Sequence, residues 1–236
     1  MNNNMDSFRI VITGGSSGIG EATAFEMAKS GHCFYLTGRN EVKLQKIVAE
    51  LHSLGCEAYY GVGDVSDEKS ASLMFDEIKQ KLGGVDVLFA NAGVGYFGNL
   101  EDLTLEQYDA QFNTNVRGVF MWINMVLPLM RAQNSGQIIV TSSNLGLKTA
   151  SRCSLYAATK HAVQAMVWCL REELKGTGVK AATINPGSVD TPWFDGKDVD
   201  RSKMLSSADV AASIRLIIDQ NETSDIDHIL LTPGRK

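Results

Sequence analysis

The chain has 236 residues, of which 44% are hydrophobic and 21% are charged, and its formal net charge is −5. This length and composition support one large hydrophobic core and argue against a disordered chain, so we expect a single domain over residues 1–236. The negative charge, without any run of Lys and Arg, argues against a nucleic-acid-binding protein.

Seven short β-rich apolar runs alternate with longer segments of helical periodicity from one end of the chain to the other. This alternation is typical of a parallel sheet covered by helices and predicts an α/β fold with helices on both faces of a seven-stranded sheet. The predicted strands are residues 8–12, 33–37, 58–61, 85–90, 137–142, 180–185 and 228–231.

The helical segments carry recognisable start signals. Periodicity predicts helices over residues 20–30, 42–54, 67–81, 154–176 and 206–220. Ser66 is the expected N-cap of the third of these helices. Another helix opens at the capping box Thr104-Leu105-Glu106-Gln107 and runs to about Arg131, and we expect Pro128 to kink or end it.

Residues 187–203 form the largest non-periodic segment and are rich in Asp, Pro and Gly. They follow a predicted strand, and ligands of open parallel sheets bind outside the carboxyl ends of the strands. The segment is therefore a candidate substrate lid, with an inert surface loop as the alternative. Its shortness favours an open pocket or a small substrate.

A glycine-rich run lies between the first predicted strand and the first predicted helix. It reads Thr13-Gly14-Gly15-Ser16-Ser17-Gly18-Ile19-Gly20. Glycines at this place permit a tight turn and close backbone approach, while the helix N-terminus offers N–H groups and a positive dipole to a pyrophosphate. The run predicts a dinucleotide site, with Gly14, Ser16, Ser17, Gly18, Ile19 and Gly20 as its residues; the alternative is a purely structural turn.

The end of the second predicted strand indicates which dinucleotide is bound. An acidic residue there would take the ribose hydroxyls of NAD, but the sequence has Gly38 followed by Arg39. An arginine can pair with the 2′-phosphate of NADP through its planar fork. We therefore prefer NADP(H), and keep NAD(H) as the alternative in case Arg39 merely points to solvent.

Two further strand ends carry polar or small residues. Asp64-Val65 follows the third strand and Asn91-Ala92-Gly93 follows the fourth, where the adenine and the ribose would lie. Both stretches are also common in ordinary turns.

Tyr156 and Lys160 are spaced four residues apart on a predicted helix, which places them on one face. A cation close to a phenol stabilises the phenolate and can bring its pKa toward neutrality. The alternative is that Tyr156 packs an interface while Lys160 is solvated.

Together with Asn115, Ser143 and Pro186-Gly187, these motifs make the chain resemble the short-chain dehydrogenase/reductase family, from about Arg9 to Leu231. The resemblance implies a doubly wound Rossmann-type fold. It also implies that Tyr156 is the general acid/base on the substrate oxygen, and that Lys160 binds the nicotinamide ribose and lowers the pKa of Tyr156.

The resemblance extends to the neighbours of this pair. Ser143, rather than Ser142, would hydrogen-bond the substrate oxygen. Asn115, rather than Asn113, would hold a water in a proton relay to Lys160. The backbone of Val189 and the hydroxyl of Thr191, after Pro186 and Gly187, would hold the nicotinamide carboxamide.

The chain departs from the family pattern near its end, which reads Leu231-Thr232-Pro233-Gly234-Arg235-Lys236 instead of Val-Asp-Gly-Gly followed by a tail. We still expect a homo-oligomer. A dimer through the helix bearing Tyr156 and the long helix before it is plausible, and the tetramer common in the family is in doubt.

Several residues are not expected to act in the chemistry. Cys33, Cys56, Cys153 and Cys169 lack CxxC spacing and a His cluster, so we expect reduced thiols and no metal site. His161 would point away from Lys160 around the helix. Leu145, Lys148, Cys153, Ser188, Trp193 and Phe194, and less clearly Tyr96 and Phe97, are candidate pocket walls.

The predicted function is that of an NADP(H)-dependent oxidoreductase that interconverts a carbonyl and an alcohol, acting as a carbonyl reductase. The alternatives are an NAD-dependent alcohol dehydrogenase and a non-catalytic NADP(H)-binding sensor. Residues 1–6 show no basic region followed by an apolar stretch, and no segment could cross a membrane, so we expect a soluble cytoplasmic protein.

Overall fold

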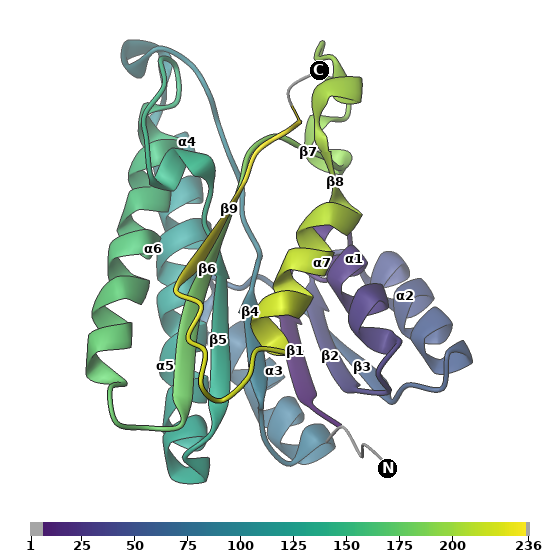
Figure 1. The fold of residues 1–236 in the computed structure, drawn as a ribbon. Coiled ribbons are helices and arrows are strands. Elements are labelled where there is room, and N and C mark those ends of the chain that lie inside the picture. The colour runs from purple at the N-terminus through teal and green to yellow at the C-terminus, as the bar shows by residue number, and fades with distance from the viewer. Residues whose placement is uncertain (1–6, 235–236) are drawn as a thin grey trace.

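Seven parallel strands form one sheet, in the order β3-β2-β1-β4-β5-β6-β9 (Figure 1). The computed structural model describes residues 7–234, so residues 1–6, on which the expectation of no leader rests, and residues 235–236 lie outside it. All seven predicted strands are confirmed to within two residues at either end: β1 Arg9–Thr13, β2 Cys33–Gly38, β3 Ala58–Val62, β4 Val87–Ala90, β5 Gly136–Thr141, β6 Val179–Pro186 and β9 His228–Leu231.

Helices cover both faces of this sheet (Figure 1). Three helices pack on one face, α1 Gly18–Ala28, α2 Glu41–Ser53 and α7 Ser207–Ile218, and three on the other, α3 Glu68–Leu82, α5 Val119–Gln133 and α6 Ser154–Glu173. Successive residues of a strand point to opposite faces, so Ile10 and Ile12 join the first core while Val11 joins the second. Among the described residues, no helix is long and apolar enough to span a membrane.

The long helix predicted after the fourth strand is divided at a different place from the one expected. The capping box between Thr104 and Gln107 is confirmed and opens α4, Leu105–Phe112. A π-helical turn, Asn113–Gly118, then separates α4 from α5. Pro128 lies inside α5, which continues to Gln133, so of the two predicted outcomes, a kink or an end, the proline does not end the helix. The interruption lies instead at the π-helical turn.

The N-cap of α3 is also one residue away from the prediction. The Asp67 carboxylate accepts a hydrogen bond of 2.7 Å from the backbone N–H of Ser70 and caps the helix. The Ser66 hydroxyl instead donates to Asp64 at 2.6 Å. Ser66 therefore orders the loop after β3.

The strand order reverses direction beside β1, which pairs with both β2 and β4. Asn91, directly after β4, locks the carboxyl ends of three strands together. Its amide donates to the carbonyl oxygens of Thr13 at 3.2 Å and Gly14 at 3.3 Å, and its side-chain oxygen accepts from Thr141 at 3.1 Å. This is the edge of an open α/β sheet where ligands bind.

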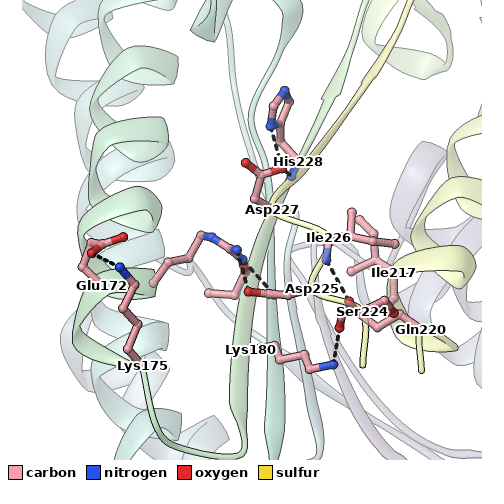
Figure 2. A network of polar contacts seen from close by, with 12 residues as sticks. Glu172, Lys175, Lys180, Ile217, Gln220, Ser224, Asp225, Ile226, Asp227 and His228 are labelled. Carbon is pink, nitrogen blue, oxygen red and sulfur yellow. Dashed lines mark hydrogen bonds and ion pairs between the residues drawn. The ribbon is translucent and has the colours of Figure 1, made fainter. Parts of the chain in front are cut away.

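The last strand, β9, fixes the start of the lid segment. The loop leading into β9 is held by polar contacts, among them a 2.7 Å hydrogen bond from Lys180 to the Ser224 carbonyl oxygen (Figure 2). At the other end of β9, the Leu231 carbonyl oxygen accepts from the Gly187 N–H at 2.8 Å. Beyond Gly187, the short strand β7 Val189–Asp190 lies within residues 187–203 and pairs in parallel with β8 Leu205–Ser206, which follows this segment.

Helix α1 requires a glycine where it crosses the loop before it. A Cβ placed on Gly20 would lie 2.4 Å from the Gly14 carbonyl oxygen. We expect Gly20→Ala to lower the free energy of unfolding by about 1–3 kcal/mol, because backbone must move to admit the methyl group. Gly234→Ala is the control, since a Cβ there meets nothing within 4 Å. Denaturant unfolding would contradict the packing argument if both variants matched the wild type.

Candidate active site

A cavity of about 730 Å³ lies at the carboxyl ends of the strands. It brings together residues from the glycine-rich loop, the ends of β2 to β6, helix α6 and the lid. The predicted site residues that line it are Gly14, Ser16, Ser17, Gly18, Ile19, Arg39, Asp64, Val65, Asn91, Ala92, Gly93, Ser143, Tyr156, Lys160, Pro186, Gly187, Val189 and Thr191. Gly20 and Asn115 lie outside the lining.

Helix α6 places Tyr156 and Lys160 on the wall of this cavity. The Lys160 side chain is buried, and its Nζ lies 5.6 Å from the centroid of the Tyr156 ring. The same nitrogen donates a 2.8 Å hydrogen bond to the carbonyl oxygen of Thr141, the last residue of β5. The end of the central strand therefore determines where the ammonium lies.

Burial, rather than the charge of Lys160, dominates the pKa of Tyr156 in the protein alone. Desolvation raises the pKa of Tyr156 to about 12, while the nearby Ser143 hydroxyl acts in the opposite direction. Desolvation also lowers the pKa of Lys160 to about 8. The expected lowering of the phenol pKa by Lys160 is therefore not found, because the ammonium is directed at Thr141 and is itself desolvated.

Ser143 and Ser142 have separate roles, as the strand alternation predicts. The Ser142 hydroxyl donates to the backbone oxygen of Lys160 at 3.2 Å and so holds α6 against the sheet. The Ser143 hydroxyl accepts from the Leu145 N–H at 3.1 Å and lies close enough to Tyr156 to affect its pKa. Ser143 is therefore the serine that can share a substrate oxygen with the phenol.

The side chain of Asn115 is fully engaged within the protein. Its oxygen accepts from the Val94 N–H at 2.8 Å, and its amide donates to the Val94 carbonyl at 2.9 Å and to the Thr159 hydroxyl at 3.1 Å. These bonds tie the loop after β4 to α6 beside Lys160. A water-holding role, which remains a prediction, would fall to the backbone of Asn115, within the π-helical turn.

The cofactor end of the cavity offers unused donors and close backbone approach. Ser17 is the N-cap of α1, but its side chain makes no capping hydrogen bond, so the first N–H groups of this helix are not capped by it within residues 7–234. Thr191, in the lid, lies against the same loop: a Cβ on Gly18 would be 3.2 Å from the Thr191 side chain. The arrangement fits a pyrophosphate at the helix N-terminus.

Arg39 lies at the far end of this cavity and is exposed. No described residue forms an ion pair or hydrogen bond with its guanidinium. A Cβ on Gly38 would already lie 3.0 Å from the Ser16 hydroxyl, so a larger acidic side chain would displace Ser16. Burial raises the pKa of nearby Asp64, but the hydrogen bonds from Ser66 and the charge of Arg39 outweigh it, and the net pKa is lowered.

Aromatic rings from the predicted lid segment, residues 187–203, and from the loop after β4 line the cavity around Tyr156. Trp193 and Phe97 flank Tyr156, with ring centroids 5.9 Å and 5.2 Å from it. A Cβ on Gly95 would lie 2.5 Å from Trp193, so the glycine permits the indole to pack on the backbone. Arg201 holds the lid from outside through ion pairs with Asp190 and Asp195.

The candidate pocket walls divide into two groups. Leu145, Cys153, Ser188, Trp193, Phe194 and Phe97 line the cavity, whereas Lys148 and Tyr96 do not. His161 is exposed and bonds to the Ala157 carbonyl. Sequence reasoning missed Thr141, which positions Lys160, and Lys197, which lines the cavity from the lid. The position of Thr141 at the end of a predicted strand could have indicated its role. Nothing in the sequence around Lys197 indicated that this residue lines the cavity.

Comparison with known proteins places this geometry in a family. A family model described as short chain dehydrogenase matches residues 9–201. An uncharacterised oxidoreductase of Staphylococcus epidermidis is 31% identical over 223 residues, which are 94% of this chain and 96% of that protein. Another from Listeria innocua is 33% identical, with 95% of each chain covered.

Solved structures agree in fold. An alcohol dehydrogenase from Thermococcus sibiricus in complex with 5-hydroxy-NADP has a TM-score of 0.90 at 30% identity, with 96% of each chain covered. A short chain dehydrogenase from Burkholderia cenocepacia in complex with NADP has a TM-score of 0.89 at 29% identity, covering 98% of this chain and 99% of that one. A relative from Burkholderia phymatum in complex with NAD scores 0.88 at 28% identity, covering 97% and 90%. The chain belongs to the short-chain dehydrogenase/reductase family of oxidoreductases.

Proposed function

We propose that this oxidoreductase is an NADP(H)-dependent carbonyl reductase, which converts a ketone or aldehyde to an alcohol. The observation that carries the proposal is the arrangement of Ser143, Tyr156 and Lys160 on one wall of a cavity whose other end is an uncapped helix N-terminus. Two hydroxyl groups that converge on one oxygen stabilise the charge that develops there.

The residues present fit a nicotinamide dinucleotide. The N-terminus of α1 would hold its pyrophosphate, Arg39 and Ser16 its 2′-phosphate, and Lys160 the hydroxyls of its nicotinamide ribose. Val189 and Thr191 would hold the carboxamide. When bound, this cofactor supplies the hydride, and the protein orients the substrate and manages one proton.

Tyr156 is suited to donate that proton. Burial raises its pKa to about 12, so the phenol is protonated throughout the neutral range. Its O–H bond can therefore be directed at a carbonyl oxygen without a preceding protonation step. The protonated phenol is the form that reduction of a carbonyl requires.

Removal of the phenol hydroxyl tests the catalytic assignment. We expect Tyr156→Phe to lower the rate of NADPH oxidation with a carbonyl panel by a factor of about 10²–10⁴, the usual contribution of a positioned acid. NADPH affinity, measured by fluorescence titration, should change little. Equal rates for both proteins would rule out the tyrosine mechanism, and tight NADPH binding without turnover on any carbonyl would favour a sensor.

The cofactor preference depends on Arg39. Loss of a charge-assisted pair costs about 1.5–3 kcal/mol, so we expect Arg39→Ala to weaken NADP(H) binding by roughly ten- to a hundredfold. NAD(H) binding should stay within about twofold, because this dinucleotide lacks the 2′-phosphate. Parallel titrations of both cofactors provide the measurement. An unchanged NADP preference in Arg39→Ala and Arg39→Asp would favour the NAD-dependent alternative.

Burial of Lys160 predicts a pH dependence of stability. Its pKa is about 8 when folded and 10.5 ordinarily, so between these values the unfolded chain binds the additional proton. Burial of the ammonium therefore lowers the free energy of unfolding below pH 8, and this destabilisation decreases as the pH rises toward 10.5. Relative to Lys160→Met, the wild type should gain about 2–3 kcal/mol between pH 7 and about 10.

The comparison of wild type and variant cancels the titration of groups that both proteins share. It requires denaturant unfolding of both cofactor-free proteins at several pH values. A stability difference that stays constant with pH would show that Lys160 does not titrate in this window.

The quaternary structure remains a prediction. Large exposed apolar side chains lie on α4, α5 and α6, including Leu105, Phe120 and Trp168. A homo-oligomer formed through these helices would cover them. Cytoplasmic localisation likewise remains a prediction from the sequence.

A further inference from the structure

Lys197, in the lid, holds its ammonium over three aromatic rings. The nitrogen lies 5.3 Å from the centroid of Phe194, 5.6 Å from Trp193 and 5.7 Å from Phe97. Each such contact is worth about 0.5–1 kcal/mol at an exposed site. The rings therefore hold the cation at the mouth of the cavity, which Lys197 lines.

The charge of Lys197 is not neutralised by the part of the chain that the structure describes. The neighbouring carboxylates of the lid are otherwise engaged: Asp190 and Asp195 pair with Arg201, and Asp200 pairs with Lys203. Asp198 forms no ion pair with Lys197 within residues 7–234. Contacts with ring faces consume none of its three N–H donors in conventional hydrogen bonds, so these remain available to an anion.

The cation lies close to the reaction centre. Phe97 and Trp193, two of the three rings beside Lys197, are also the rings that flank Tyr156. A molecule whose carbonyl oxygen lies at Tyr156 can therefore extend along these rings and reach the ammonium. Phe97 lies in the loop after β4, and its ring contacts that of Tyr156, so Lys197 lies on the Tyr156 side of the cavity.

The charged side chains on the cavity wall near Tyr156 are positive. Among the described residues that line the cavity, Asp64 is the only carboxylate, and it lies beside Arg39 at the cofactor end. Lys160 and Lys197 are the charged groups near Tyr156. Such a wall attracts anionic substrates and disfavours cationic ones.

We propose that the physiological substrate is a carbonyl compound that carries a carboxylate, and that Lys197 binds this carboxylate while the chain between the two groups packs on Phe97 and Trp193. This inference rests on the proposed carbonyl reductase function and specifies its substrate class. Lys197 is then a specificity-determining residue that takes no part in proton or hydride transfer.

A matched pair of substrates tests the proposal. 4-Oxopentanoate is a stable keto acid, and its methyl ester differs from it mainly by the lost charge. We expect Lys197→Met to lower kcat/KM for the acid by about ten- to a hundredfold, the value of one charge-assisted contact, and to change that for the ester by less than about threefold. Lys197→Glu should invert the preference.

Lys203→Met is the control, because it removes a lid lysine that pairs with Asp200 and does not line the cavity. It should leave both substrates unaffected. Equal losses on acid and ester in Lys197→Met would overturn the proposal and show that the lysine only closes the lid. A loss of NADPH affinity in that variant would overturn it in favour of a cofactor contact.

A binding measurement separates failure of this inference from failure of the proposed function. Trp193 lies beside Lys197, so its fluorescence should report the binding of 4-oxopentanoate in the presence of NADP⁺, with Trp193→Phe to identify the signal. Saturable binding that Lys197→Met abolishes supports the anion site even without turnover. Turnover of the ester without any preference for the acid would support the carbonyl reductase activity and contradict the proposal that the substrate carries a carboxylate.

Discussion

The buried ammonium of Lys160 is the constraint on which the site depends. The side chain is 3% exposed, and within residues 7–234 no carboxylate pairs with it. Its one hydrogen bond to protein goes to the Thr141 carbonyl oxygen at the end of β5. A cation in such a place destabilises the fold unless it is satisfied, so the strand end, the helix and the adjoining loop must meet at one point.

Several contacts around Lys160 hold the end of β5, helix α6 and the loop after β4 together. Ser142 bonds the backbone of Lys160 to the sheet, and Asn115 ties the loop after β4 to Thr159, one residue before the lysine. A Cβ on Gly93 would lie 3.7 Å from the ammonium. Tyr156 lies one turn before Lys160 on α6, so the contacts that fix Lys160 also fix the position of the phenol. The phenol is therefore held in place before any ligand binds.

The sequence predicted the parts of the fold that depend on local pattern. Each strand is a short apolar run bounded by turn residues, and its shortness and flanking residues distinguish it from a buried helix. The errors fell where two local signals compete. Pro128 was expected to kink or end a helix, yet α5 continues past it, and Asp67 rather than Ser66 caps α3 because Ser66 bonds to Asp64.

The same distinction holds within the site. The spacing from Tyr156 to Lys160 lies within one helix, and the glycine-rich loop lies between adjacent elements, so both could be read from short stretches of sequence. The protonation state of Tyr156 could not, because desolvation is set by residues brought together from distant segments. Lys197 was missed for that reason: its significance depends on Phe97, 100 residues earlier in the chain, lying under the folded lid.

The two ends of the cavity are built from different kinds of contact. The cofactor end consists of backbone at strand ends and a helix N-terminus, held by the bonds of Asn91 and by the packing of Gly20 on Gly14. The proposed substrate end includes side chains of residues 187–203, a segment held by the ion pairs of Arg201 and by the hydrogen bond from Gly187 to β9. Under the proposed function, substitutions in residues 187–203 would change which carbonyl compound is bound while Tyr156 and Lys160 stay in place. Substrate preference would then be separable from the chemistry, and the charge of Lys197 is the feature of this segment proposed to set it.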